Sequence, residues 1–296
     1  MLLFHRNLKI VKFLGGLGNQ MFQYAFYKSL SECYSNVKAD LSDFHSYDLH
    51  YGFELDKVFY IQLKKASNFE SKLLDKHGSN NNWYYRKLRR ISGLKKAYYH
   101  EKTEFNFDPQ IYSEGDKSVR YFWGYWQCEK YFETIKDSLV SDFTFTKPLD
   151  DENKAILQEI ESCNSVSIHI RRGDYVNHPL LGNITTLEYY QTAISIIKTT
   201  IENPVFFVFS NDIEWCKETL KEDGFKFINN NTNAQSYVDM QLMSRCKHNI
   251  IANSSFSWWA AWLNQNPNKI IISPKKWTNN PEYTYHGLIL DSWIKI

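Results

Sequence analysis

Residues 165–175, which read Ser-Val-Ser-Ile-His-Ile-Arg-Arg-Gly-Asp-Tyr, begin like a strand and end with groups that can hold an anion. Apolar and polar side chains alternate up to Ile170, the period of a half-buried strand. Adjacent strand residues point to opposite faces, so Arg171 is expected to share a face with His169. Arg172 is expected to turn back onto a carboxylate such as Asp174. A guanidinium at the carboxyl end of a strand suits phosphate, but a purely structural Arg–Asp pair explains this stretch equally well.

Two further strand ends in the second half of the chain carry polar groups. Ser210-Asn-Asp212 follows one predicted strand, and Asn253-Ser-Ser255 follows another and opens a helix. The ends of parallel strands share one edge of a sheet, and hydroxyls and free N–H groups at a helix start can meet an oxygen anion. These groups therefore predict a ligand site at one sheet edge.

Asp239 lies early in the helix that precedes the Asn253 turn. Its carboxylate could accept hydrogen bonds from the N1–H and N2–H₂ edge of guanine. The alternative is an acid in a first helical turn that is stabilised by the helix dipole. Local sequence favours this second interpretation.

The first half of the chain opens with a predicted strand at 8–14, a glycine turn, a helix at 21–33 and a strand at 37–41. This order predicts a βαβ unit with parallel strands. The turn is not a full dinucleotide fingerprint, because Met21 stands where the third glycine is expected. Either it is only a tight turn, or its backbone N–H groups bind an anion. The candidates in the second case are Gly16, Gly18, Asn19 and Gln20.

The elements that must position these groups form two sets, divided near the polar segment 146–150. Helices and continuous apolar strands alternate regularly through the second half, which predicts a doubly wound parallel sheet. The predicted domains are 1–147 and 148–296, and the last helix is a candidate to pack back on the first. A basic, aromatic-rich segment at 83–99 could lie on an anionic membrane surface, but a solvated helix face is the favoured interpretation.

Composition narrows the class of protein. The chain has 296 residues, 43% of them hydrophobic, and a net charge of +2, which does not indicate a nucleic-acid binder. Five widely spaced cysteines predict reduced thiols in a cytoplasm, and no apolar run is long enough for a signal peptide or a membrane span. Membrane contact is expected to be peripheral at most. No Asp-x-Asp, His-x-His or Cys/His cluster occurs, so we expect no cofactor and no essential metal.

Four motifs together resemble those of a known family. They are His169-x-Arg-Arg-Gly-Asp-Tyr175, Gly15-Gly-Leu-Gly-Asn-Gln-Met-Phe-Gln-Tyr24, Ser210-Asn-Asp212 and Asn253-Ser-Ser-Phe-Ser-Trp-Trp259. In this order, from residue 10 to about residue 265, they resemble the α-1,2-fucosyltransferases of glycosyltransferase family 11. The resemblance is highly specific as a set and weak for any motif alone.

The resemblance implies an α/β protein of the GT-B class, with two Rossmann-like domains facing across a cleft. The first would be the acceptor-side domain and the second the GDP-fucose-binding domain. It implies inverting transfer of L-fucose from GDP-β-L-fucose to the 2-hydroxyl of a terminal galactoside in a surface glycan. The animal members carry an amino-terminal membrane anchor. Because the sequence shows no such anchor, it resembles the bacterial members, which act in the cytoplasm. The alternatives are another nucleotide-sugar transferase or a non-catalytic carbohydrate-binding protein.

The resemblance also implies roles for single residues. Arg171 would hold the β-phosphate, with His169 against the diphosphate or nucleoside, and Asp239 matches an aspartate that reads guanine in related core fucosyltransferases. The core enzymes carry a glutamate after the arginine motif, but this chain has Asn177-His-Pro-Leu there, so that base does not carry over. Asp40 is the candidate base, and a dissociative transfer with a weak base is the alternative. The other expected donor contacts are Arg172, Asp174, Ser210, Asp212, Asn253, Ser254 and Ser255.

Overall fold

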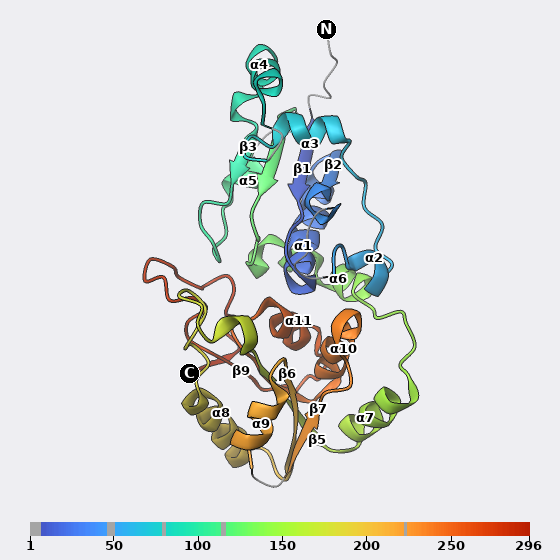
Figure 1. The fold of residues 1–296 in the computed structure, drawn as a ribbon, viewed down its shortest axis with the longest axis vertical. Helices are drawn as coiled ribbons and strands as arrows, with labels where there is room; N and C mark the ends of the chain where they lie inside the picture. Colours follow the sequence, from blue (N-terminus) through green and yellow to red (C-terminus); the bar gives the residue numbers. More distant parts are fainter. Residues whose placement is uncertain (1–6, 46–50, 79–80, 114–116, 222–223) are drawn as a thin grey trace. The chain divides into compact units, whose positions relative to one another are not determined.

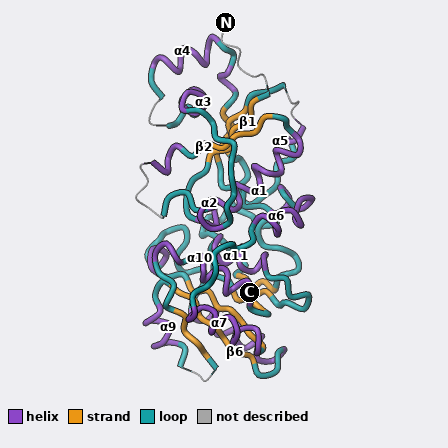
Figure 2. The backbone as a smooth tube through the Cα atoms, turned by 90° about the vertical axis from the view of Figure 1, so that its right-hand side faces the viewer, coloured by secondary structure: helices purple, strands orange, loops and turns teal. Residues whose placement is uncertain are grey.

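A computed structural model describes residues 7–45, 51–78, 81–113, 117–221 and 224–296. The chain divides into two compact units, Met1–Thr144 and Phe145–Ile296. In each unit the strands, orange in Figure 2, gather into one sheet with helices packed around it. The observed division falls a few residues before the position predicted from the sequence.

Unit 1 is built on a four-stranded parallel sheet with the order β2-β1-β4-β3 (Figure 1). The predicted βαβ unit is confirmed, because β1 and β2 pair in parallel on either side of α1 in the sequence. Apolar strand residues such as Ile10 and Val11 are fully buried. The strands are β1 (Leu8–Lys12), β2 (Asn36–Asp40), β3 (Tyr98–His100) and β4 (Arg120–Trp123); the α-helices are α1 (Leu17–Cys33), α2 (Leu55–Val58), α3 (Asn68–Leu74), α4 (Trp83–Ile91), α5 (Gln110–Ser113) and α6 (Lys136–Asp142).

Two local predictions in unit 1 need correction. Helix α1 begins at Leu17 rather than at residue 21, because the chain turns into the helix directly after Gly16. The basic segment 83–99 is only half helical: α4 ends at Ile91, and Gly93 with a φ of 71° starts a short 3₁₀ turn that leads into β3. Glycine permits this left-handed conformation at little cost.

Unit 2 contains the predicted doubly wound sheet, with six parallel strands in the order β10-β9-β8-β5-β6-β7. Apolar residues of α8 and α9 pack on one face of the central strands, and α7, α10 and α11 pack together around the other. The strands are β5 (Asn164–Ile170), β6 (Pro204–Ser210), β7 (Phe225–Ile228), β8 (His248–Ile250), β9 (Ile271–Ser273) and β10 (Ile294–Lys295); the helices are α7 (Asp151–Ser162), α8 (Leu187–Thr200), α9 (Ile213–Thr219), α10 (Tyr237–Arg245) and α11 (Ser255–Leu263).

The last helix of the chain is α11 (Ser255–Leu263), and packing of a last helix on the first domain stays a prediction. Within residues 264–296, all of which the structure describes, the ordered elements are β9 and β10. Ile294 pairs with Ile272 and Lys295 with Ser273, so the end of the chain adds an edge strand to the sheet of unit 2.

Candidate active site

Three polar strand ends lie side by side in unit 2, as the sequence predicted. β5 pairs with β6 on one side and with β8 on the other, all in parallel. Ile170 stands opposite Ser210, so the arginine turn after β5 and the Ser-Asn-Asp turn after β6 leave the sheet together. Parallel α/β sheets bind ligands at this carboxyl edge.

His169, the penultimate residue of β5, is 6% exposed. Burial, followed by the charge of Arg171, lowers its pKa to about 3, so the imidazole is neutral at physiological pH. The Tyr190 hydroxyl donates to the His169 carbonyl at 3.0 Å and fixes the strand end. His169 Nδ1 has no hydrogen-bond partner in the described part of the chain, although a buried polar atom ordinarily has one.

The carboxylate partner of Arg172 differs from the one expected. Arg171 Nη2 lies 2.9 Å from Asp174 Oδ1, whereas Arg172 Nε donates to Asp212 Oδ2 at 3.0 Å. The predicted Arg172–Asp174 pair is wrong because β5 already ends at Ile170, so the alternation of a strand does not extend to the arginines. Arg171 Nε is buried and lacks a partner among the described residues.

Arg172 is fixed by its surroundings. Its guanidinium lies over the Trp215 ring, 3.9 Å from the ring centroid, and its backbone N–H donates to Asn211 Oδ1 at 2.9 Å. A Cβ on Gly173 would come within 2.3 Å of Asn211 Nδ2, so a larger residue there would have to displace the Asn211 amide that holds the Arg172 N–H. Sequence reasoning named the Ser-Asn-Asp turn but did not single out Asn211.

Ser210 and Asp212 hold this turn together. The Asp212 N–H donates to Ser210 Oγ at 2.9 Å, and the Asp212 carboxylate accepts from the Trp215 N–H at the start of α9 as well as from Arg172. Both side chains are therefore engaged with protein groups, and they position Arg172.

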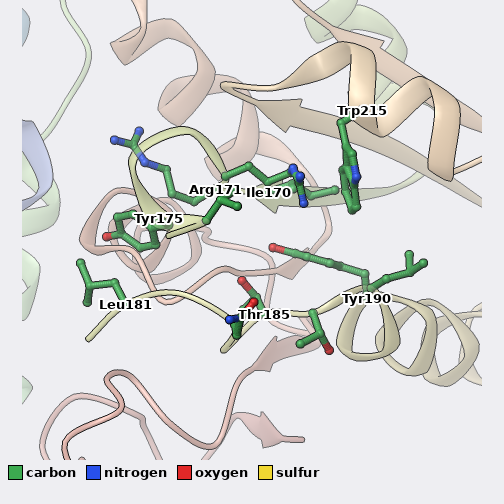
Figure 3. A pocket seen from close by; sticks show the side chains of 12 residues that line it. Ile170, Arg171, Tyr175, Leu181, Thr185, Tyr190 and Trp215 are labelled. Carbon is green, nitrogen blue, oxygen red and sulfur yellow. The ribbon is translucent and has the colours of Figure 1, made fainter. Parts of the chain in front are cut away.

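A cavity of about 250 Å³ opens beside the arginine turn (Figure 3). Arg171 and Tyr175 lie at one end, and Trp215 and Tyr190 at the other. Sequence reasoning missed Trp215, Tyr190 and Thr185. They lie on separate elements, and only the fold brings them to the cavity.

The turn after β8 presents an open helix start. Ser254 is the N-cap residue of α11, but its side chain makes no capping hydrogen bond and the first turn holds no acid. Asn253 is 1% exposed and donates to the carbonyls of Leu181 and Trp277, while its Oδ1 lacks a partner among the described residues. The rings of His169 and Phe256, the latter in the first turn of α11, lie 5.7 Å apart. The α11 start with Ser254 and Ser255 therefore lies beside β5.

Asp239 lies in the first turn of α10, which starts at the same sheet edge because it follows β7. Its Oδ1 accepts from Asn231 Nδ2 at 2.8 Å. Burial raises the pKa of this carboxyl to about 7. An exposed acid that only complements a helix dipole would have a lowered pKa, so the environment of Asp239 differs from that of simple helix decoration.

The glycine turn of unit 1 packs against other groups of the protein. Glu54 is buried at the start of α1: its backbone N–H donates to Gln20 Oε1 at 2.9 Å, and its carboxyl lies close to the Leu17 N–H. The Gln20 side chain is fully buried and bonds to Gly15 O, Gly52 O and Glu54 N. The Gln20 side chain is therefore engaged inside the protein, as in a tight turn, whereas anion contacts from the backbone N–H groups of Gly16, Gly18 and Asn19 stay a prediction. Asn19 Oδ1 accepts from Gln127.

Asp40, the candidate base, is 2% exposed and its carboxylate is fully engaged. Oδ2 accepts from the Tyr121 hydroxyl at 2.6 Å and lies 3.6 Å from Lys12 Nζ, and Oδ1 accepts from Ser42 N. Desolvation is the largest single influence on its pKa, but Lys12 and these hydrogen bonds outweigh it and lower the pKa. A buried, satisfied carboxylate of this kind suits an ion pair better than a base for an incoming hydroxyl.

Two α/β units, each with a parallel Rossmann-like sheet, are the parts from which glycosyltransferases of the GT-B class are built, and this chain is a glycosyltransferase. It belongs to glycosyltransferase family 11, whose profile, described as "Glycosyl transferase family 11", matches residues 5–296.

Similar proteins include an alpha-1,2-colitosyltransferase of Escherichia coli, 36% identical over 98% of this chain and 99% of its own length. The O-antigen biosynthesis glycosyltransferase WbnK of Escherichia coli is 32% identical over 95% and 98%. A galactoside alpha-(1,2)-fucosyltransferase 1 of Leontopithecus chrysomelas is 28% identical over 45% of this chain and 40% of its own.

Solved structures also resemble the chain. Fucosyltransferase NodZ from Bradyrhizobium aligns with a TM-score of 0.47 and 13% identity over 86% of this chain and 91% of its own. Arabidopsis thaliana FUT1 aligns with a TM-score of 0.49 and 12% identity over 90% and 70%. No helix within the described residues has the length and apolar character needed to cross a membrane.

Proposed function

We propose that this chain transfers L-fucose from GDP-β-L-fucose, with inversion, to the 2-hydroxyl of a terminal galactoside. The observation that carries the proposal is a set of unpartnered groups at one edge of the unit 2 sheet. Within the part of the chain that the structure describes, His169 Nδ1 and Arg171 Nε are buried without partners, and the neighbouring start of α11 lacks a side-chain cap. Donors left open in this way fit the oxygens of a diphosphate.

Arg171 carries the main charge-stabilising role in this proposal. When the acceptor hydroxyl attacks the sugar, the bond between the anomeric carbon and the β-phosphate oxygen breaks and negative charge grows on the diphosphate. A preorganised guanidinium stabilises that charge. The carboxylate that pairs with Arg171 among the described residues is that of Asp174, whose side chain is 59% exposed, so a diphosphate can replace it, and the Arg171 guanidinium also lies over the Tyr175 ring. Arg172, fixed by Asp212 and Trp215, adds positive charge beside it.

The remaining roles follow from position. Neutral His169 contacts the donor through Nδ1, the Ser254–Ser255 turn binds phosphate oxygen, and Asp239 accepts hydrogen bonds from guanine. The burial of Asp40 speaks against its role as base, so we propose a dissociative transfer in which a weak base suffices. We propose no metal, because arginine and backbone N–H groups can carry the diphosphate charge.

The direct test combines GDP-fucose with a panel of galactosides and determines the linkage of the product. We expect an α-1,2-linked fucosyl galactoside. GDP-fucose that is neither bound nor consumed, with every galactoside, would contradict the proposal.

A second donor is favoured by the similarity to the alpha-1,2-colitosyltransferase, which extends over 98% of this chain. The corresponding colitosyl nucleotide, whose sugar lacks the 3-hydroxyl of L-fucose, should be compared with GDP-fucose on the same acceptors. A kcat/KM higher for the colitosyl donor would assign the chain to colitose transfer by the same site.

A further inference from the structure

A buried polar network connects the first turn of α7 with Asp239. Asn153 and Asn231 are 2% and 6% exposed, and each donates its Nδ2 to the other's Oδ1 at 2.9 Å. Asn153 Nδ2 also donates to Asp150 Oδ1 at 2.9 Å. Such a reciprocal amide pair fixes the orientation of both side chains, because rotating either amide would break both bonds.

The network ends on Asp239. The second Nδ2 hydrogen of Asn231 is donated to Asp239 Oδ1 at 2.8 Å. One carboxylate oxygen is thereby held by the protein, and the partly buried carboxyl keeps acceptor capacity for further donors. A carboxylate that must accept two N–H groups from a flat base edge needs a fixed plane, and Asn231 supplies it.

We propose that Asn231, held by Asn153, is a positioning residue that orients Asp239 for the nucleotide base and so sets guanine selectivity. This inference rests on the proposed function, in which Asp239 reads guanine. Asn231 lies in the loop before α10, outside the four motifs that carry the family resemblance.

The same contact connects base recognition to pH. Burial raises the pKa of Asp239 to about 7, and the hydrogen bond from Asn231 opposes this rise because it stabilises the ionised form. The ionised carboxylate accepts on both oxygens and more strongly than the neutral acid, in which one oxygen carries a proton, so GDP affinity should fall as the pH drops through about 7. Loss of the Asn231 donor raises the pKa further and moves this fall to higher pH.

Other charged groups near α10 are engaged elsewhere. On the α7 side, Asp150 bonds to Asn153, and Arg245 at the far end of α10 pairs with Glu161. Lys147 lies over the Tyr237 ring, 5.6 Å from its centroid. Neither α11 nor the 3₁₀ turn before α10 (Asn233–Gln235) carries a charged side chain. Asn231 is therefore the polar contact through which the protein controls this carboxyl.

The test is titration of GDP and inosine diphosphate, which lacks the 2-amino group, into the wild type and Asn231→Leu between about pH 5.5 and 8.5. We expect the wild type to prefer GDP and its affinity to fall below about pH 7. In Asn231→Leu the preference should shrink and the midpoint should rise by about one pH unit. Asn230→Leu is the matched control: it also loses a bond to Asn153, at 3.1 Å, but none to Asp239. Its preference and midpoint should match the wild type.

Two further variants separate the possible failures. Asp239→Ala should lose the preference and the pH step together. If the wild type does not bind GDP, the proposed function fails. If the wild type prefers GDP and Asp239→Ala abolishes the preference, but Asn231→Leu behaves like Asn230→Leu, only the positioning role is overturned. A melting curve will show whether Asn231→Leu folds. If it does not, Asn153→Ala replaces it: this variant keeps Asn231 as the donor to Asp239 but removes the side chain that holds Asn231. We then expect a smaller rise of the pH midpoint, and no rise would overturn the inference.

Discussion

The carboxyl edges of the two sheets are built from similar elements but differ in whether their polar groups are engaged by the rest of the protein. At the edge of unit 1, the Glu54 carboxyl lies close to the start of α1, and Asp40 is paired with Lys12. At the edge of unit 2, the start of α11 has no side-chain cap, and His169 and Arg171 hold buried atoms without partners among the described residues. A glycine turn or a helix start thus indicates a possible anion site, but the groups that the rest of the fold brings there decide whether it is open.

The largest effect predicted from the difference between the two edges is at Arg171. We expect Arg171→Lys to lose roughly 10²–10³ in the rate of transfer, because lysine keeps the charge but not the planar fork that matches a phosphate. The melting temperature should stay near that of the wild type, since the side chain is partly exposed and its ion pair is with the exposed Asp174. A folded variant with a rate within a few-fold of the wild type would remove Arg171 from its assigned role.

Asp40→Asn tests the carboxyl edge of the unit 1 sheet, where Asp40 is paired with Lys12. The variant leaves the buried ammonium of Lys12 with less opposing charge, although Asp43 still accepts from Lys12 at 2.7 Å. We expect a loss of about 1–3 kcal/mol in unfolding free energy and little change in the rate per folded molecule. Asp43→Asn, at a side chain that is 54% exposed, is the control and should cost less. A rate that collapses in Asp40→Asn without loss of stability would restore Asp40 as the base.

Glu101 follows β3 at the same carboxyl edge of unit 1, but its carboxyl, unlike that of Asp40, has a raised pKa. Its Oε2 accepts from the Tyr125 and Trp126 N–H groups, its Oε1 is buried without a partner among the described residues, and burial raises its pKa to about 7. Between the unfolded pKa near 4.5 and about 7 the folded state binds the extra proton, so stability falls as the pH rises through this window. Glu101→Gln should remove that part of the slope and gain roughly 1–3 kcal/mol at pH 8. Urea unfolding at pH 5 and pH 8 measures it, and equal values for the variant and the wild type at both would contradict the assignment.

Chelation should have the smallest effect. If arginine and backbone N–H groups carry the diphosphate charge, transfer should persist in EDTA. Complete loss of activity that an added divalent ion restores would mean that the open edge needs a metal.

Much of the fold could be predicted from the sequence because parallel strands are long apolar runs and their helices start at recognisable caps. α11 begins and ends where predicted, at Ser255 and Leu263, and the side-by-side strand ends follow from topology alone. The end of the chain was predicted less well, because β10 is only two residues long and depends on its pairing with β9.

The partners of side chains were the least predictable part. Which carboxylate pairs with Arg171 and which with Arg172 depends on where β5 ends. The burial of Glu54 at the glycine turn depends on contact with a segment more than thirty residues away in the sequence. Trp215, Tyr190 and Asn231 lie outside the motifs, so nothing in the local sequence indicated them. Contacts of this kind exist only in the folded chain.

The most direct test of the difference between the two edges is hydrogen exchange of the backbone amides with and without GDP. We predict slower exchange for residues 171–175 and 254–257 in unit 2 when GDP is bound, and unchanged exchange for residues 15–20 in unit 1. Protection of residues 15–20 without protection of residues 171–175 would contradict the account.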